Sequence, residues 1–98
     1  MSDDYQKLSE DQINRELVKL KGWTVENGKL TRTLEFKDFN EAFGFMTRVA
    51  MEVEKLNHHP EWFNVYNKVK IELVTHDVNG ISNYDFRLAN IINRIAGK

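Results

Sequence analysis

The most informative segment of this sequence is Glu54-Lys55-Leu56-Asn57-His58-His59-Pro60-Glu61-Trp62-Phe63-Asn64-Val65-Tyr66. It holds two of the three histidines and the single proline of a 98-residue chain. Proline fixes its own φ and disfavours helical angles in the residue before it, so a helix has to end ahead of Pro60. Aromatic and β-branched residues follow, and they favour a strand. The stretch therefore predicts a stiff helix-to-strand corner from which two adjacent imidazoles project.

A long helix is predicted ahead of this corner, from a cap at Asp38, with Glu41 three residues later, to about Leu56. Its apolar residues form two neighbouring stripes, namely Phe39, Phe43, Met46, Ala50 and Val53 beside Ala42, Phe45, Val49 and Leu56. Together the stripes span roughly 160°, which is wider than one core contact requires. The helix is either sunk deeply into its own sheet, or it packs one flank on the sheet and turns the other to a partner subunit. We favour the second arrangement, with Phe45 and Val49 on the partner surface.

The corner leads into a predicted hairpin, with strands at Trp62–Tyr66 and Val69–Thr75 and a turn at Asn67–Lys68. Apolar and charged residues alternate in the second strand, as in a sheet with one solvated face. In a hairpin, the start of the first strand lies beside the end of the second. His76, which follows the second strand, should therefore lie close to the two histidines of the corner.

Two further elements are predicted on the N-terminal side. A first helix, Ser9–Lys21, begins with a capping box at Ser9. A first hairpin joins Trp23–Glu26 to Lys29–Phe36 through Asn27-Gly28, because both turn residues tolerate the positive φ that a tight turn needs.

A final helix is predicted to begin at Ser82, since Asp85 three residues later completes another capping box. The element order is then α-β-β-α-β-β-α, which predicts an α+β domain with a four-stranded antiparallel sheet and helices packed on one face. A chain of 98 residues has room for one domain, residues 1–98, in which residues 1–7 are expected to be a loose leader.

Composition excludes several classes of protein. The formal net charge is −1 and charges of both signs are interspersed, whereas direct nucleic-acid binding needs a basic face. The absence of cysteine excludes disulfides, thiolate nucleophiles and cysteine metal sites. The N-terminus lacks the apolar core of a signal peptide, and no apolar run is long enough for a membrane span. We therefore expect a protein of the cytoplasm and nucleus that binds neither nucleic acid directly nor a membrane.

The three histidines are candidates for proton transfer, because imidazole both donates and accepts protons near neutral pH. Each has a simpler interpretation: His58 and His59 complement the dipole of a helix C-terminus, and His76 is a loop residue. An all-histidine zinc site is known chemistry. Adjacent side chains such as those of His58 and His59 rarely face one ion, however, so we predict no metal.

The spacing of these residues carries a family resemblance. The pattern is Glu54-x-x-x-His58-His59-Pro60, followed by Tyr66, His76 and Asp85. It resembles the full signature of the pterin-4a-carbinolamine dehydratases, and the similarity covers nearly the whole domain. The chain looks most like the animal members of the family, which double as dimerisation cofactors of a hepatocyte homeodomain transcription factor.

The resemblance implies a hydro-lyase that converts 4a-hydroxytetrahydrobiopterin to quinonoid dihydrobiopterin, in the recycling of tetrahydrobiopterin. It implies no metal and no cofactor, since the pterin is the substrate. By the same resemblance His58, His59 and His76 are catalytic. We expect His58 and His76 to transfer protons, and His59 to bind and orient the pterin.

The resemblance also implies a wider set of site residues. Substrate contacts are expected from Asn57, His58, His59, Trp62, Val74, Thr75, His76 and Asp77. Supporting roles are expected for Glu54, Pro60, Tyr66 and Asp85. Four of these have simpler interpretations: Trp62 and Tyr66 are core or sheet-packing aromatics, Glu54 is a solvated helix residue and Asp85 is a helix cap. Asn57 departs from the family pattern, in which aspartate is frequent, and the change removes a charge beside the histidines.

The resemblance further implies a homotetramer, built as a dimer of dimers, whose helical face binds the dimerisation helices of a transcription factor. Such contacts give the two apolar stripes of the long predicted helix a purpose. The second class of function, different in kind from catalysis, is therefore a protein-binding transcriptional coactivator.

Overall fold

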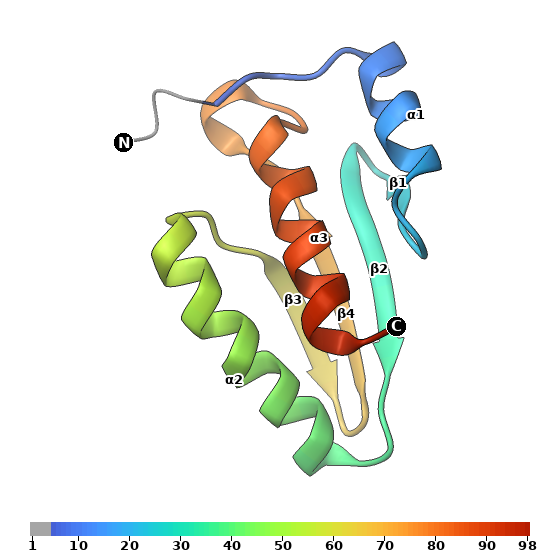
Figure 1. Cartoon of the computed structure of the whole chain (residues 1–98), viewed down its shortest axis with the longest axis vertical. Coiled ribbons are helices and arrows are strands. Elements are labelled where there is room, and N and C mark those ends of the chain that lie inside the picture. The colour runs from blue at the N-terminus through green and yellow to red at the C-terminus, as the bar shows by residue number, and fades with distance from the viewer. Residues whose placement is uncertain (1–4) are drawn as a thin grey trace.

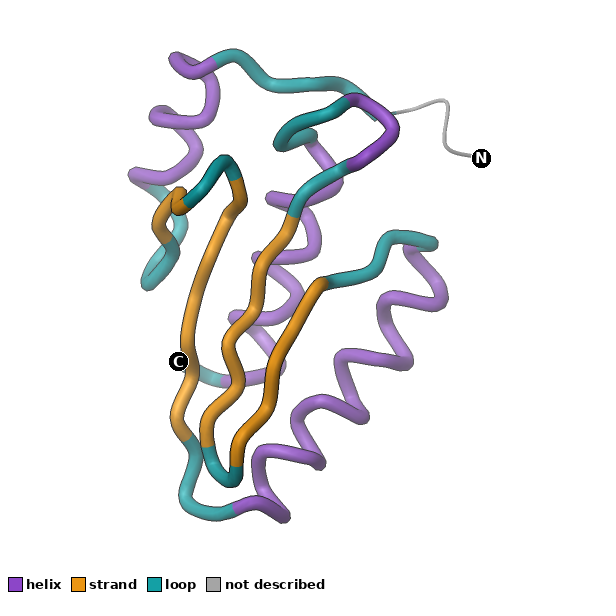
Figure 2. The backbone as a smooth tube through the Cα atoms, turned by 180° about the vertical axis from the view of Figure 1, so that it is seen from behind, coloured by secondary structure: helices purple, strands orange, loops and turns teal. Residues whose placement is uncertain are grey.

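The computed structural model describes residues 5–98, which form three α-helices beside a four-stranded antiparallel sheet (Figure 1). The elements in chain order are α1 Glu10–Val18, β1 Thr24–Glu26, β2 Lys29–Glu35, α2 Phe39–Leu56, β3 Glu61–Val65, β4 Lys68–Leu73, the 3-10 turn η2 His76–Val78 and α3 Asn83–Ala96. The strand order is β1-β2-β4-β3. Seen from behind (Figure 2), the strands pass in front of α3. Buried side chains of α2 and α3 share one core with those of β2 and β4, so these two helices cover the same face of the sheet. The predicted α+β fold and its element order are confirmed.

The core lies between the sheet and helices α2 and α3. Its buried side chains include Leu30, Leu34, Ala42, Phe45, Val49, Val53, Val69, Ile71, Leu73, Leu88, Ala89 and Ile92. The sheet side of this core comes from alternate residues of β2 and β4, as the period-2 pattern predicted. Among residues 5–98, no helix is both long and apolar enough to cross a membrane.

The first helix is shorter than predicted. Its capping box at Ser9 is present. However, α1 ends at Val18 and not at Lys21, because the chain then tightens into bonds such as that from the Leu20 N–H to the Leu17 carbonyl, at 3.0 Å. The tighter turn places Leu20 in the core.

The second hairpin turns one residue earlier than predicted. Val65 pairs with Lys68, which leaves Tyr66 and Asn67 as the two turn residues, and both strands begin one residue earlier. Asn67 is held from outside the hairpin: its carbonyl accepts a bond from the Phe36 N–H at 2.8 Å, and its side chain donates to the Phe36 carbonyl at 2.9 Å. These contacts fix the turn at Asn67, so Tyr66 adopts a φ of +52°.

The two apolar stripes of α2 have different surroundings. Ala42, Phe45 and Val49 are completely buried, whereas Phe39 and Phe43 are 49% and 54% exposed. The placement of Phe45 and Val49 on a partner surface is therefore wrong, because these side chains form the core. The exposed flank of α2 is the one that carries Phe39 and Phe43.

Arg32 interrupts the apolar alternation of β2 because it joins three segments. Its guanidinium donates to Asn93 Oδ1 on α3 at 2.6 Å, to the Lys21 carbonyl at 3.2 Å and to the Lys98 carbonyl at 3.0 Å. The cation thus ties the end of the chain and the connection after α1 to the sheet.

Candidate active site

The end of α2 turns the two corner histidines in different directions. Asn57 ends the helix in the left-handed conformation, with φ of 57°, and its N–H donates to the Val53 carbonyl at 2.8 Å. Asparagine adopts this conformation more readily than most residues with a side chain. Beyond it His58 is 6% exposed, whereas the His59 side chain is 56% exposed and Pro60 leads into β3. Asn57 therefore has a structural role at the corner.

His58 lies in a buried hydrogen-bond network centred on Asp85. Its Nε2 is 2.6 Å from Oδ1 of Asp85, which is completely buried. The other carboxylate oxygen accepts bonds from the Thr75 hydroxyl and the Ser82 N–H, each at 2.8 Å. The Ser82 bond belongs to the predicted capping box of α3, which is present. Asp85 is therefore both a helix cap and the partner of His58.

The network decides which nitrogen of His58 is available for chemistry. A carboxylate in its ionised form only accepts hydrogen bonds, so with Asp85 in that form the contact places a hydrogen on Nε2 of His58. This leaves Nδ1 as the nitrogen that can gain or lose a proton. An imidazole with one ring nitrogen held by a buried carboxylate is suited to acid-base catalysis.

His76 is exposed and is held by a carboxylate that the sequence interpretation missed. Its Nε2 is 3.0 Å from Glu61 Oε2, and the other Glu61 oxygen accepts a bond from Lys29 Nζ at 2.7 Å. Hydrogen bonds from Lys29 and His76 hold the pKa of Glu61 below its ordinary value. Glu61 is the first residue of β3. The predicted hairpin, which placed His76 close to the corner, could therefore also have indicated that Glu61 lies near His76.

His59 faces a third carboxylate. Its Nε2 is 3.1 Å from Glu54 Oε2, and both side chains are exposed. The three histidines thus belong to one end of the sheet, as the predicted hairpin requires, but each faces a different acid. In the described part of the chain, no group of three or more His, Asp or Glu side chains is gathered as a metal ion would need.

The other predicted site residues are distributed unevenly. The Thr75 side chain is buried in the network described above, Val74 is half-buried and Asp77 is exposed on η2. Trp62 is half-buried and packs against the core, as in its simpler interpretation. Tyr66 lies in the turn at the far end of β3, 61% exposed, so the fold does not bring it to the histidines.

A residue of the expected leader is also part of the corner. The Tyr5 ring centroid lies 5.8 Å from that of His58 and 4.7 Å from that of Tyr84, edge-on in both cases. Residues 5–7 are not a loose leader, because their backbone pairs with the residues around Ser82. Residues 1–4 lie outside the described part of the chain. No local sequence pattern pointed to Tyr5.

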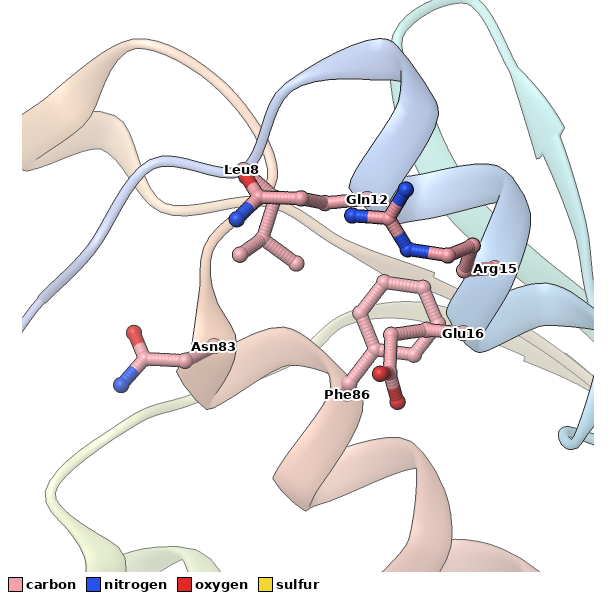
Figure 3. Close-up of a pocket in the computed structure, with 6 residues that line it drawn as sticks. All are labelled: Leu8, Gln12, Arg15, Glu16, Asn83 and Phe86. Atoms are coloured by element: carbon pink, nitrogen blue, oxygen red, sulfur yellow. The ribbon is translucent and has the colours of Figure 1, made fainter.

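A hollow of about 340 Å³ lies apart from the corner, between α1 and the start of α3 (Figure 3). Its lining residues are Leu8, Gln12, Arg15, Glu16, Asn83 and Phe86. This set contains none of the predicted site residues, so the hollow and the histidine corner are separate features.

The Glu61→Gln variant is expected to lose part of the acid sensitivity of folding. The pKa of Glu61 is lower in the folded protein than its ordinary value of 4.5, so its stabilising effect is complete above that pH and is lost as the pH falls through the lower, folded value. A plot of Tm against pH, from about pH 6 to about pH 3, should therefore be shallower for Glu61→Gln than for wild type at its acid end.

The same measurement at high salt is the control. The Glu61 side chain is 40% exposed, so its ion pairs are screened, and the difference between the two proteins should shrink. Parallel Tm curves at low salt would contradict the assigned network.

Comparison with known proteins decides the family. The model of the family described as pterin 4 alpha carbinolamine dehydratase matches residues 6–95. The chain belongs to this family. The matched range contains all three histidines together with Glu61 and Asp85, so the corner lies within the dehydratase domain.

Named relatives in this family cover nearly all of the chain. A relative from Solibacter usitatus, named for the same dehydratase, is 53% identical over 90 residues, which is 92% of this chain and 95% of the relative. A similarly named relative from Prochlorococcus marinus is 55% identical over 86 residues, 88% of this chain and 90% of the relative. A crystal structure from Brucella melitensis, described as a transcriptional coactivator/pterin dehydratase, has a TM-score of 0.90 at 47% identity and covers 94% of this chain and 100% of its own.

Proposed function

We propose that this pterin dehydratase converts 4a-hydroxytetrahydrobiopterin to quinonoid dihydrobiopterin, in the recycling of tetrahydrobiopterin. The observation that carries the proposal is the buried contact between His58 and Asp85 beside the exposed His59 and His76. It combines an oriented imidazole with two imidazoles that a substrate can reach from solvent. Both kinds of group are needed to bind a polar heterocycle and exchange protons with it.

The reaction needs an acid and a base but no oxidant or reductant. The C4a–O bond breaks as the hydroxyl takes up a proton and leaves as water. A ring nitrogen loses a proton, and its electron pair forms a double bond to C4a, so atoms and electrons balance. In the proposal, His58 and His76 exchange these two protons, and His59 binds and orients the pterin. No metal ion and no cofactor take part.

The test is the decay of the 4a-hydroxytetrahydropterin intermediate, generated by an aromatic amino-acid hydroxylase, with and without the protein. We expect His76→Ala to lower kcat by about 100-fold, because general acid-base groups contribute at least that much. His59→Ala should act mainly on KM, since it removes a binding contact. Val18→Ala, at an 87% exposed position on α1, is the control and should match wild type.

Two results would contradict the proposal. If the intermediate decays no faster with the wild-type protein than in buffer, the proposed dehydratase activity is contradicted. A stoichiometric metal ion in the purified protein, with activity lost on chelation, would contradict the metal-independent mechanism.

A second proposal concerns assembly and protein partners, and two exposed apolar surfaces favour it. One is the α2 flank with Phe39 and Phe43; the other is on edge strand β3, where Phe63 and Val65 are 68% and 57% exposed. A dimer of dimers needs two different self-complementary interfaces. The chain has two exposed apolar surfaces, and exposed apolar surface of this kind is typical of interfaces. We propose that these two surfaces form the interfaces of a homotetramer. We also propose that the protein is found in the cytoplasm and nucleus.

The same α2 flank is the proposed contact for the dimerisation helices of a homeodomain transcription factor. The similarity to the Brucella melitensis coactivator supports this role. Phe43→Glu should lower the molar mass measured by light scattering and abolish capture of a helical dimerisation peptide. A tetramer that still forms and still binds the peptide would place both contacts elsewhere.

A further inference from the structure

We propose that Tyr5 is a positioning residue, which closes over His58 and holds its ring in the orientation that the reaction uses. The inference deepens the proposed function and rests on it. The cover is built from a segment at the opposite end of the sequence from Asp85, the other group that holds His58. The three residues thus form one unit, with the imidazole between a carboxylate and an aromatic ring.

The segment that carries Tyr5 is fixed to the loop before α3. The Leu8 N–H donates to the Ile81 carbonyl at 2.9 Å, and the Gln6 N–H donates to Asn83 Oδ1 at 2.9 Å. In return the Asn83 N–H donates to the Gln6 carbonyl at 3.2 Å. Figure 1 shows this part of the chain, in blue, running past the orange loop that leads into α3. The backbone that holds Tyr5 is thus anchored next to the capping box that holds Asp85.

From this anchor the Tyr5 side chain spans the corner. Its ring meets the rings of His58 and Tyr84 edge-on, at 5.8 and 4.7 Å, and the Tyr84 and His58 rings are 5.8 Å apart. Its hydroxyl lies 3.5 Å from the Asn57 carbonyl, at the outer limit of a hydrogen bond. Tyr5 therefore contacts both the end of α2 and the start of α3.

This enclosure explains why two adjacent histidines differ so much in exposure, 6% for His58 against 56% for His59. The Asp85 contact fixes one nitrogen of His58, but a single hydrogen bond leaves the ring free to tilt about that point. Edge-on contacts with Tyr5 and Tyr84 restrict the tilt and exclude water from one side. Small errors in the placement of a catalytic group are costly, so a restricted tilt bears directly on rate.

Tyr5 acts as a neutral cover. Burial raises the pKa of Tyr5, with further contributions from Asp77, Tyr84 and Asp85, so its phenol stays protonated near neutral pH.

Chemical labelling of histidine with diethyl pyrocarbonate tests the cover without any substrate. In wild type, His59 and His76 should react quickly and His58 slowly, as their exposures require. Tyr5→Ala should convert the slow histidine to a fast one, located by mass spectrometry. Tyr5→Phe should restore the slow phase, because it keeps the ring. Gln6→Ala is the matched control on the same segment, since Gln6 bonds to Asn83 through its backbone.

Two further readouts separate positioning from simple support of the fold. The ring ¹⁵N chemical shifts of His58 should move in Tyr5→Ala and return in Tyr5→Phe. The kcat of Tyr5→Ala should fall about tenfold with little change in KM, because the substrate contacts remain while the imidazole is less well placed. Far-UV circular dichroism tests whether each variant is folded. If Tyr5→Ala is unfolded, Tyr5→Leu takes its place in all of these measurements.

A His58 that stays slow to react and keeps its ¹⁵N shifts in the folded variant would overturn the inference. So would a Tyr5→Phe variant that behaves like Tyr5→Ala, since the ring would then not be the cover. An inactive wild-type protein with the expected labelling pattern would instead contradict the proposed function and leave the cover of His58 established.

Discussion

Asp85→Ala is expected to destabilise the protein by about 3–5 kcal/mol, because it breaks a buried, hydrogen-bonded charge network. Asp85 is completely buried and accepts bonds from His58, Thr75 and Ser82. Alanine leaves all three donors buried without this acceptor, and each such donor is costly. Urea unfolding monitored by tryptophan fluorescence gives the free energy of unfolding directly.

Asp85→Asn separates the two roles of this residue. The amide keeps the shape of the carboxylate, so folding should suffer less than in Asp85→Ala. One side of the amide is now a donor, however, and it must face either His58 Nε2 or the pair formed by the Thr75 hydroxyl and the Ser82 N–H. We expect kcat to fall by about 100-fold or more, because the orientation and charge balance of His58 are lost.

Asp38→Ala is the matched control. Asp38 caps α2 by accepting a bond from the Glu41 N–H at 2.8 Å, as Asp85 helps to cap α3, but it holds no histidine. Its loss should cost about 1 kcal/mol, the usual effect of removing a cap. An Asp85→Ala variant that is no less stable than Asp38→Ala, or an Asp85→Asn variant with wild-type kcat, would show that the His58 contact contributes little.

Phe45→Ala is expected to cost about 3–5 kcal/mol of folding free energy, as is usual for a phenylalanine removed from a core. The Phe45 side chain is completely buried, and its ring centroid lies 4.9 Å from that of Phe36. Phe43→Ala offers a matched comparison two residues earlier on the same helix. Because Phe43 is 54% exposed, its loss should change the stability of the isolated chain by no more than about 0.5 kcal/mol.

The comparison should be made at several protein concentrations. If copies of the chain cover Phe43, the cost of Phe43→Ala will grow with concentration, as binding linked to folding requires. A cost equal to that of Phe45→Ala at the lowest concentration would contradict the assignment of Phe43 to the exposed flank.

Local chemistry was sufficient to predict the elements and their order. The capping boxes at Ser9 and Ser82 and the Asn27-Gly28 turn are decided by residues within three positions of one another, and all are present. The corner before Pro60 was predicted for the same reason, since proline acts on its own backbone and that of its neighbour. The predicted pairing of the two hairpin strands also placed His76 at the same end of the sheet as the corner.

The predictions that failed depended on contacts between distant segments. The turn at Tyr66 lies one residue earlier than predicted because Asn67 bonds to Phe36, which follows β2. The flank of α2 with Phe45 became the core and not a partner surface, because a wide apolar arc does not indicate which side meets the sheet.

Sequence patterns were enough to predict three candidate imidazoles, a stiff corner that presents two of them, and membership of the pterin dehydratase family. The group that each imidazole faces depends on contacts between segments far apart in the sequence. His58 and Asp85 are 27 positions apart, and His76 and Glu61 are 15 apart, so no local pattern could pair them. The directions of adjacent side chains depend on backbone angles at the corner, and those were set when Asn57 took the left-handed conformation. That conformation, together with packing against α3 and Tyr5, turned one of two adjacent histidines inward and left the other in solvent.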